Sequence, residues 1–403
     1  MKISPHWLSW PQTQALLNAF EQMPLRFVGG SVRDALLNRE VQDVDAATPL
    51  LPEQVMELLG KSQIKVIPTG IDHGTVTAII SPHQFEITTL RRDVATDGRR
   101  AIVAYTQDWK EDAARRDFTM NALYCDRHGE LYDYFGGTQD AQNGQVRFIG
   151  DATTRIAEDA LRILRFFRFF AHYGQGEIDA QGLQACAASA AKVDNLSGER
   201  IEQEMMKLLV AKNAGDLIGL MQQQQILPHI ISHPVNTQAL SALPQVLRSA
   251  GHAPDALLSL ACLLRSNAGG AGPAIDAIDA RWKLSKADYR KLQELCKPLI
   301  AGVTWADEKK IKKHLRALGK ELFIQQILLL MAEGSDTLGG LKAIEFALGW
   351  TIPEFPVTGN DLLAMGFVPG RKLGAHLAML ENYWEEQGYG LDKEQLLMRL
   401  SVK

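Results

Sequence analysis

The chain has 403 residues and a formal net charge of −4. A chain of this length exceeds one ordinary hydrophobic core, so we expect two to four domains, and the acidic balance argues against a general nucleic-acid-binding protein while still permitting a local phosphate site. It has no apolar run long enough to cross a bilayer and no secretory signal at its start, so we expect no membrane partner.

The first predicted elements surround a pair of glycines. Residues 25–28 are predicted to form a short strand and residues 31–38 a helix, with Gly29 and Gly30 at the turn between them. A backbone bare of side chains lets a phosphate approach closely, and Arg33 follows within one helical turn. The turn is therefore a candidate triphosphate site.

A second strand is predicted over residues 41–46 and carries two carboxylates, Asp43 and Asp45. Residues i and i+2 of a strand project from the same face, so both can bind the same ions. Mg²⁺ prefers oxygen ligands, and two-metal phosphoryl transfer needs acidic ligands of this kind. A D-x-D string alone is weak evidence, but behind a Gly-Gly-x-x-Arg turn it indicates a catalytic Mg²⁺ site.

Residues 75–80 and 84–90 are predicted to form a hairpin across residues 81–83. Glu86 alternates with apolar neighbours, so it is either a third carboxylate of the metal site or a partly exposed strand residue. The polar segment 91–100, with Asp97-Gly98 at its centre, is predicted to be a mobile loop.

Two arginine-rich segments follow. Residues 112–123 are predicted to form a helix that starts with a charged block, in which Arg116 either clamps triphosphate oxygens or pairs with Asp117. Residues 155–169 are predicted to form one amphipathic helix with an apolar stripe. Its polar arc is either salt-bridged or able to read the amino-bearing edge of cytosine or adenine, and it carries Asp159, Arg162, Arg165 and Arg168.

From residue 151 onward the periodicity is helical, so the chain is predicted to be α+β: a head with a small mixed sheet, then an all-α remainder. The four cysteines are scattered, without a C-x-x-C pair, so we expect neither disulfides nor zinc and place the protein in a reducing cytoplasm.

The motifs together resemble the class II tRNA nucleotidyltransferase and poly(A) polymerase family, most closely its bacterial CCA-adding members. The resemblance covers about residues 25–210 and follows the family's order of motifs: Gly29-Gly30-x-x-Arg33-Asp34, Asp43-x-Asp45, Arg115-Arg116-Asp117-Phe118-Thr119-x-Asn121-Ala122-Leu123, Glu158-Asp159-x-x-Arg162 and Gly198-Glu199-Arg200-Ile201. It implies a nucleotidyltransferase head of the polymerase-β type over residues 1–137, a helical neck over 138–212, a helical body over 213–350 and a tail over 351–403.

The resemblance also implies roles. Asp43 and Asp45 would hold Mg²⁺ and be catalytic, whereas the nucleotide would be bound by Gly30, Arg33, Arg116, Asp159, Arg162, Arg165 and Arg168, with Asp159 and Arg162 selecting the base. The implied reaction adds C-C-A to the 3′ end of tRNA from CTP and ATP without a template. The alternative is a poly(A) polymerase or a partial CC- or A-adding enzyme; residues 92–100 are similar to the flexible loop of full CCA-adding members. Contacts to the tRNA acceptor stem would come from the C-terminal helices, where Lys and Arg gather at 309–316.

Overall fold

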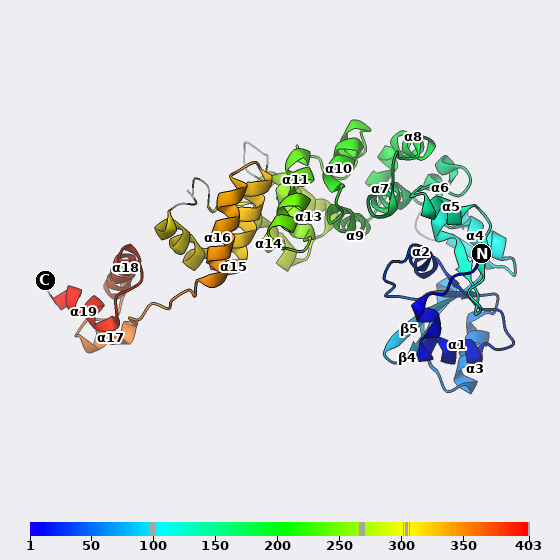
Figure 1. The fold of residues 1–403 in the computed structure, drawn as a ribbon, viewed down its shortest axis with the longest axis horizontal. Helices are drawn as coiled ribbons and strands as arrows, with labels where there is room; N and C mark the ends of the chain where they lie inside the picture. Colours follow the sequence, from blue (N-terminus) through cyan, green and yellow to red (C-terminus); the bar gives the residue numbers. More distant parts are fainter. Residues whose placement is uncertain (97–100, 266–270, 301, 303–304, 306, 402–403) are drawn as a thin grey trace. The chain divides into compact units, whose positions relative to one another are not determined.

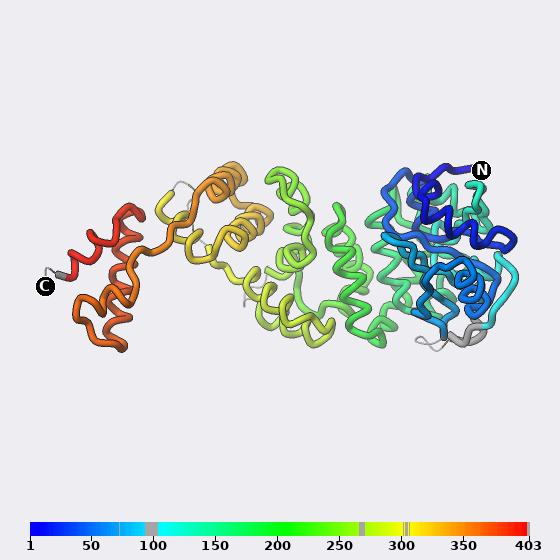
Figure 2. Tube along the Cα trace, turned by 90° about the horizontal axis from the view of Figure 1, so that it is seen from below, coloured from blue at the N-terminus to red at the C-terminus, as the bar shows by residue number. Residues whose placement is uncertain are grey.

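The computed structural model describes residues 1–96, 101–265, 271–300, 302, 305 and 307–401. The chain divides into two compact units, one formed by residues 1–233 with 277–284 and the other by residues 234–276 with 285–403. Each is described by itself (Figures 1 and 2). The predicted boundaries at 137, 212 and 350 divide the chain more finely and stay predictions.

The first unit contains a seven-stranded mixed sheet, which confirms the predicted α+β head. Only β2 and β5 pair in parallel within it, and all other neighbouring strands are antiparallel. In spatial order the strands are β3 (Lys65–Gly70), β4 (Thr75–Ile80), β5 (His83–Thr89), β2 (Ala46–Thr48), β1 (Arg26–Val28), β8 (Leu123–Cys125) and β9 (Leu131–Asp133).

Side chains from both faces of this sheet are buried. On one face, apolar residues of β4 and β5 pack with Leu16 of α1 (Pro11–Ala19) and Leu59 of α3 (Pro52–Lys61). On the other, Tyr124 of β8 packs with Ala113 of α4 (Trp109–Ala114). Because β5 buries alternate residues, Phe85 faces the core and Glu86 is exposed. The predicted hairpin of β4 and β5 is confirmed.

The strand predicted over residues 41–46 is wrong in extent, because β2 begins only at Ala46. Of the preceding residues, Gln42, Asp43 and Asp45 are polar and exposed. The segment has no partner strand among the described residues, apart from one bond in which Val28 N–H donates to the carbonyl of Asp45 at 2.9 Å. Val44 is nonetheless buried between exposed Asp43 and Asp45. The alternation that places both aspartates on one side is therefore preserved.

The segment predicted as a loop over residues 91–100 is partly a strand. β6 (Arg91–Thr96) pairs antiparallel with β7 (Ala101–Tyr105) in a two-stranded ribbon. The loop was predicted without a partner strand, and β7, whose sequence is mostly apolar, is that partner. Residues 97–100 lie outside the described residues.

The helix predicted over residues 112–123 is also wrong. α4 ends at Ala114, so Arg115 and Arg116 follow a helix rather than start one, and a single 3₁₀ turn, η3 (Thr119–Asn121), leads into β8. Asp108 caps α4 by accepting from the Lys110 N–H at 2.8 Å, which places the helix start earlier than predicted. The apolar residues after Asp117 do not share one helix face: Phe118 packs against the rings of Phe148, Phe166 and Phe169, and Leu123 begins β8.

The amphipathic helix predicted over residues 155–169 is broken into two. α6 (Ala152–Glu158) ends at Asp159, whose backbone is extended (φ −153°, ψ 106°), and α7 (Leu161–Tyr173) continues. α7 buries the predicted apolar stripe and packs against α9 (Figure 1). The other helices of this unit are η1 (His6–Ser9), α2 (Gly30–Leu36), η2 (Ile71–His73), α5 (Gly137–Gln142), α8 (Ala180–Ala188), η4 (Ala190–Asn195), α9 (Gly198–Leu209), α10 (Ala214–Gln223) and η5 (Leu227–His229).

The second unit is helical throughout its described part, as predicted. Its last three helices enclose a small core of their own, with Leu362, Leu380, Trp384 and Leu396 at its centre. No described helix is long and apolar enough to cross a membrane. The helices are α11 (Thr237–Ser249), α12 (Ala256–Leu264), α14 (Lys286–Cys296), α15 (Glu308–Ala332), α16 (Thr337–Gly349), α17 (Gly359–Ala364), α18 (Arg371–Glu386) and α19 (Lys393–Ser401), while α13 (Gly272–Trp282) spans the boundary between the units.

Candidate active site

The glycine turn joins β1 to α2. Gly29 has a φ of 75°, which L side chains rarely adopt, and its N–H donates to the carbonyl of Leu123 at 3.1 Å. A Cβ at Gly29 would lie 3.5 Å from Nη1 of Arg116, and a Cβ at Gly30 would lie 3.6 Å from Nη2 of Arg33. The structure therefore brings both predicted phosphate-binding arginines to the turn.

Three carboxylates interact near this turn. β2 and β5 pair with Ala46 opposite Ile87, so the residues one step earlier, Asp45 and Glu86, lie side by side. Desolvation of the carboxyl, Glu86 and Asp43 together raise the pKa of Asp45 to about 6, against the opposing effect of Arg116. The carboxylate of Asp45 is thus surrounded by other acids, a setting that a bound cation would relieve.

These acids suit a divalent metal ion. Asp43 and Asp45 supply the hard oxygen donors that Mg²⁺ selects, and the raised pKa of Asp45 shows that its charge is incompletely compensated by protein groups. Among the residues that the structure describes, no three His, Cys, Asp or Glu side chains converge into a ready-made metal cluster. A metal held here would therefore take its remaining ligands from water and from the substrate.

Arg116 is fixed by buried partners. Its Nη2 lies 3.3 Å from Oδ2 of Asp112, and its Nε donates to the Tyr124 hydroxyl at 3.3 Å. Tyr124 in turn donates to the same oxygen of Asp112 at 2.7 Å. The Arg116–Asp117 pair offered as an alternative does not form, because Asp117 is engaged by Arg165. This leaves Nη1 of Arg116 beside the glycine turn.

Arg33 has more protein partners than an arginine whose guanidinium is wholly available to bind phosphate. Its guanidinium donates to both carboxylate oxygens of Asp34 at 3.0 and 2.9 Å, to Oδ1 of Asn121 at 2.5 Å and to the hydroxyl of Tyr173 at 2.6 Å. It is nearly buried. Arg33 therefore ties α2 to the end of α7 as well as standing at the turn.

Arg165 and Arg168 of α7 are likewise paired. Arg165 donates to Oδ2 of Asp117 from Nε at 2.8 Å and from Nη2 at 2.5 Å. Arg168 donates from Nε to Glu204 of α9, whose other oxygen lies 3.6 Å from Nη1 of Arg165. Burial lowers and the two acids raise the pKa of Arg165, with the acids prevailing. The structure thus places the charged flank of α7 against the segment that carries Arg116.

Asp159 and Arg162 lie at the break between α6 and α7, and the Arg162 N–H donates to the carbonyl of Asp159 at 3.1 Å, but their side chains take different partners. Asp159 accepts from Nη2 of Arg200 at 2.7 Å, and this pair is about one-third exposed. Arg162 is more buried: it donates to Glu158 at 2.6 Å and to two backbone carbonyls, those of residues 155 and 115. The two side chains therefore lie in the same segment but are held by different partners.

Several residues of this network have no role in the predictions made from the sequence: Asp112, Asn121, Tyr124, Tyr173 and Glu204. Of these, Asn121 belongs to the quoted motif that begins at Arg115. Arg200 stood in a quoted motif without a role. Glu204 lies four residues after Arg200 on α9, so helical spacing places the two on one face, a signal that was available. No sequence signal singles out the two tyrosines, since aromatic residues at such positions ordinarily belong to the core.

Comparison with known proteins supports one family. Residues 25–147 match the model of the poly A polymerase head domain, and residues 177–236 match that of the probable RNA and SrmB-binding site of polymerase A. The human mitochondrial CCA tRNA nucleotidyltransferase 1 is 36% identical over 386 residues, which cover 94% of this chain and 86% of the human protein. The CCA-adding enzyme of Leuconostoc citreum is 31% identical over 393 residues, covering 95% and 93%.

A solved structure agrees over nearly the whole length. The crystal structure of the Bacillus stearothermophilus CCA-adding enzyme in complex with CTP superposes with a TM-score of 0.73 at 25% identity, covering 98% of each chain. With relatives above 30% identity along nine-tenths of its length, the chain belongs to the tRNA nucleotidyltransferase and poly(A) polymerase family.

Proposed function

We propose that this protein adds C, C and A in turn to the 3′ ends of tRNAs, using CTP and ATP and no nucleic-acid template. The observation that carries the proposal is the placement of Asp43 and Asp45 beside a glycine turn against which Arg116 is held. The full-length likeness to CCA-adding enzymes selects this reaction among those that such a site can perform.

The residues around the turn have distinct roles in this proposal. Gly30 offers backbone to the triphosphate, while Arg33 and Arg116 supply positive charge to its oxygens. Asp159 and Arg162 select the base, and Arg165 and Arg168 complete the pocket. The internal partners of Arg162 and Asp159 support this, because a base-reading group must be held still before the nucleotide arrives.

The reaction transfers a nucleotidyl group. The 3′-hydroxyl of the RNA gives up its proton to solvent and its oxygen bonds to the α-phosphorus, while the bond from that phosphorus to the bridging oxygen breaks and pyrophosphate leaves. Asp43 and Asp45 would hold Mg²⁺, which supplies charge stabilisation to the attacking and leaving oxygens. The chain's own groups orient the triphosphate and keep the reacting atoms in line.

A reducing compartment, such as the cytoplasm, fits this proposal. All four cysteines are unpaired, and burial raises the pKa of the Cys125 thiol to about 12, which keeps it protonated and inert. The protein would bind tRNA at its acceptor stem and 3′ end. The basic stretch over residues 309–316 is a candidate for contacts with the tRNA phosphates.

The test is the product formed on a tRNA that ends at the discriminator base. With CTP alone we expect two added residues, and with CTP and ATP together three and no more. A long A ladder would indicate a poly(A) polymerase, and products stopping at CC or requiring a CC end would indicate a partial enzyme. Absence of any Mg²⁺-dependent incorporation would contradict the proposal.

A further inference from the structure

The end of α7 is held by residues of the α2 segment, defined here as residues 30–39. Tyr173 is the last residue of α7, and its ring centre lies 4.0 Å from the guanidinium carbon of Arg33 and 4.4 Å from that of Arg39. Arg39 also donates to the carbonyl of His172 at 2.7 Å. Two arginines of one segment therefore contact a single aromatic ring of another.

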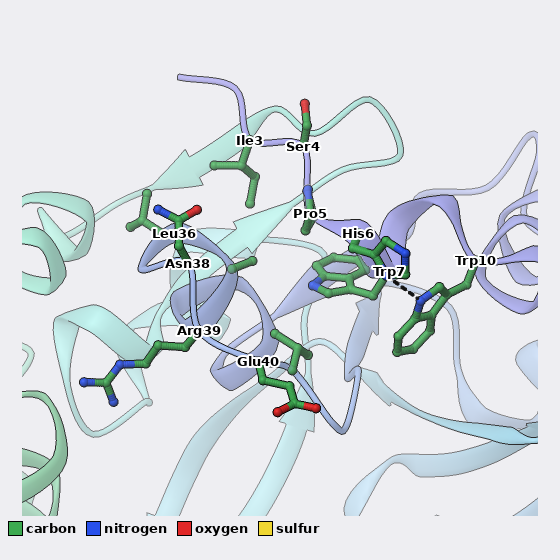
Figure 3. Close-up of a pocket in the computed structure, with 12 residues that line it drawn as sticks. Ile3, Ser4, Pro5, His6, Trp7, Trp10, Leu36, Asn38, Arg39 and Glu40 are labelled. Atoms are coloured by element: carbon green, nitrogen blue, oxygen red, sulfur yellow. Dashed lines mark hydrogen bonds between the residues drawn. The ribbon is translucent and has the colours of Figure 1, made fainter.

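Arg39 is directed toward α7 although it borders a cavity. The cavity, of about 560 Å³, lies between the N-terminal residues 3–10 and residues 35–41. Figure 3 shows the guanidinium of Arg39 extending away from Trp7 and Trp10 on the far wall. It contacts the carbonyl of His172 and the ring of Tyr173, so its contribution is to α7 rather than to the cavity.

A second aromatic ring extends this contact along α7. Phe169 stacks on Tyr173, with ring centres 5.7 Å apart and planes 25° apart. The guanidinium of Arg33 lies 5.3 Å from the Phe169 ring, and those of Arg165 and Arg168 lie 5.2 and 4.4 Å from it. We call Phe169 and Tyr173 the aromatic platform. It is touched by the arginine of the glycine turn and by both arginines of the α7 flank.

We infer that Tyr173 is a positioning residue that sets the alignment between the triphosphate-binding turn and the base-selecting flank of α7. The inference rests on the proposed function. A nucleotide must meet the turn with its triphosphate and the flank with its base at once, so a small shift between α2 and α7 misaligns one end. Tyr173 acts through Arg33 and Phe169 and does not itself touch substrate.

The hydroxyl of Tyr173 contributes as well as its ring. Arg33 donates to it at 2.6 Å, and burial together with a hydrogen bond to Asp34 raises the pKa of Tyr173, against the opposing effect of Arg33. A protonated hydroxyl accepts from Arg33 and donates to Asp34 in the same geometry. The ring and the hydroxyl therefore restrain Arg33 from two directions.

The test uses the full chain with Tyr173→Leu, which removes ring and hydroxyl, and Tyr173→Phe, which keeps the ring. For Tyr173→Leu we expect KM for CTP and ATP to rise about tenfold and discrimination against UTP to fall similarly, as lost cation–π contacts and misalignment imply. Tyr173→Phe should keep KM for CTP and ATP, and discrimination against UTP, close to the wild-type values. Arg39→Met, at an exposed surface position, should shift both in the same direction by a smaller factor and serves if Tyr173→Leu fails to fold.

The matched control is Tyr132→Leu. Tyr132 of β9 also lies against an arginine, with the guanidinium of Arg26 3.5 Å from its ring, and donates to an aspartate, Asp126, at 3.2 Å, but both partners belong to the head. It should lower the melting temperature without altering KM or discrimination. Variants at 173 and 39 that behave as this control does would overturn the inference. A wild-type enzyme that adds no CCA would instead contradict the proposed function, so the two failures are distinguishable.

Discussion

Arg165 of α7 donates two hydrogen bonds to a single oxygen of Asp117, at 2.8 and 2.5 Å. The other oxygen of Asp117 accepts from the Phe118 N–H at 2.8 Å and from Asn121 at 3.0 Å. One buried carboxylate thus fixes the arginine flank of α7 to the segment that presents Arg116 to the glycine turn. The placement of the flank depends on this charge being ionised.

The pH dependence of stability should reveal the role of Asp117. Burial alone would raise its pKa, but Arg165 and the hydrogen bonds to Asn121 and Phe118 outweigh burial and lower the pKa below 3.8. The unfolded chain therefore binds the proton first as the pH falls. The stabilisation is complete above the unfolded pKa of 3.8 and is lost as the pH falls through the lower folded value.

We expect Asp117→Asn to lower the free energy of unfolding by about 2 kcal/mol near neutral pH, because the half-buried Arg165 loses its nearest counter-charge and keeps only the more distant Glu204. The difference from wild type should shrink below a pH of about 4. Urea unfolding at several pH values measures both quantities. Glu53→Gln, at an exposed position of α3, removes a charge without a buried partner and should show neither effect. A constant difference across the pH range would contradict the assignment.

The metal site makes a prediction in which stability and activity move in opposite directions. Desolvation of the carboxyl, Glu86 and Asp43 together raise the pKa of Asp45 to about 6, so its charge costs free energy in the metal-free protein. Asp45→Asn should therefore raise the melting temperature in the presence of a chelator while lowering nucleotide incorporation by at least about 10³-fold. Thermal unfolding and a single-turnover assay with CTP measure the two effects.

Glu86→Gln is the matched variant, since it relieves the same repulsion from the neighbouring strand. It should also raise the melting temperature of the chelated protein. Its activity decides whether Glu86 is a metal ligand: a loss comparable to that of Asp45→Asn assigns it to the metal, and near-normal activity makes it a strand residue. An Asp45→Asn variant that stays active would remove the metal assignment.

The general plan of the fold could be predicted because its signals are local. The hairpin of β4 and β5 follows from strict alternation, the turn at Gly29 from the glycine pair, and the helical remainder from its periodicity. The break at Asp159 could not, because the apolar stripe continues through it. Only the Asp159 side chain, which accepts from the Leu161 N–H at 3.1 Å, offers the backbone an alternative to the helix.

The site could be predicted in its residues but not in its pairings. Arg33, Arg116 and Arg165 each belong to a motif, whereas their partners Tyr173, Asp112 and Asp117 are set by tertiary packing. A sequence indicates which groups are charged; it does not indicate which of several acids faces which arginine. The wrong helix over residues 112–123 has the same cause. Its charged block resembles a helix start, but in the structure α4 ends at Ala114 and Asp117 pairs with Arg165, which lies outside the segment.

Base selection is expected to depend on Asp159 and Arg162 in separable ways. Arg162 is held by Glu158 and by two carbonyls, and Asp159 by Arg200. In a desolvated pocket an unmatched polar edge costs about 1–3 kcal/mol, so Asp159→Ala or Arg162→Ala should lower discrimination against UTP and GTP by roughly tenfold or more. Competing CTP and UTP on the same tRNA measures the ratio directly.

The control for base selection is Arg155→Ala. Arg155 pairs with the same carboxylate, Glu158, from the other side and leaves Asp159 and Arg162 in place. A structural loosening of the α6–α7 break would affect Arg155→Ala and Arg162→Ala alike, whereas base reading would affect only the latter. Equal discrimination in the two variants would show that Arg162 supports the break and that the base is read by other groups. Because Arg200 is the partner of Asp159, Arg200→Ala should reproduce the Asp159→Ala loss in part, through a carboxylate that is present but no longer held.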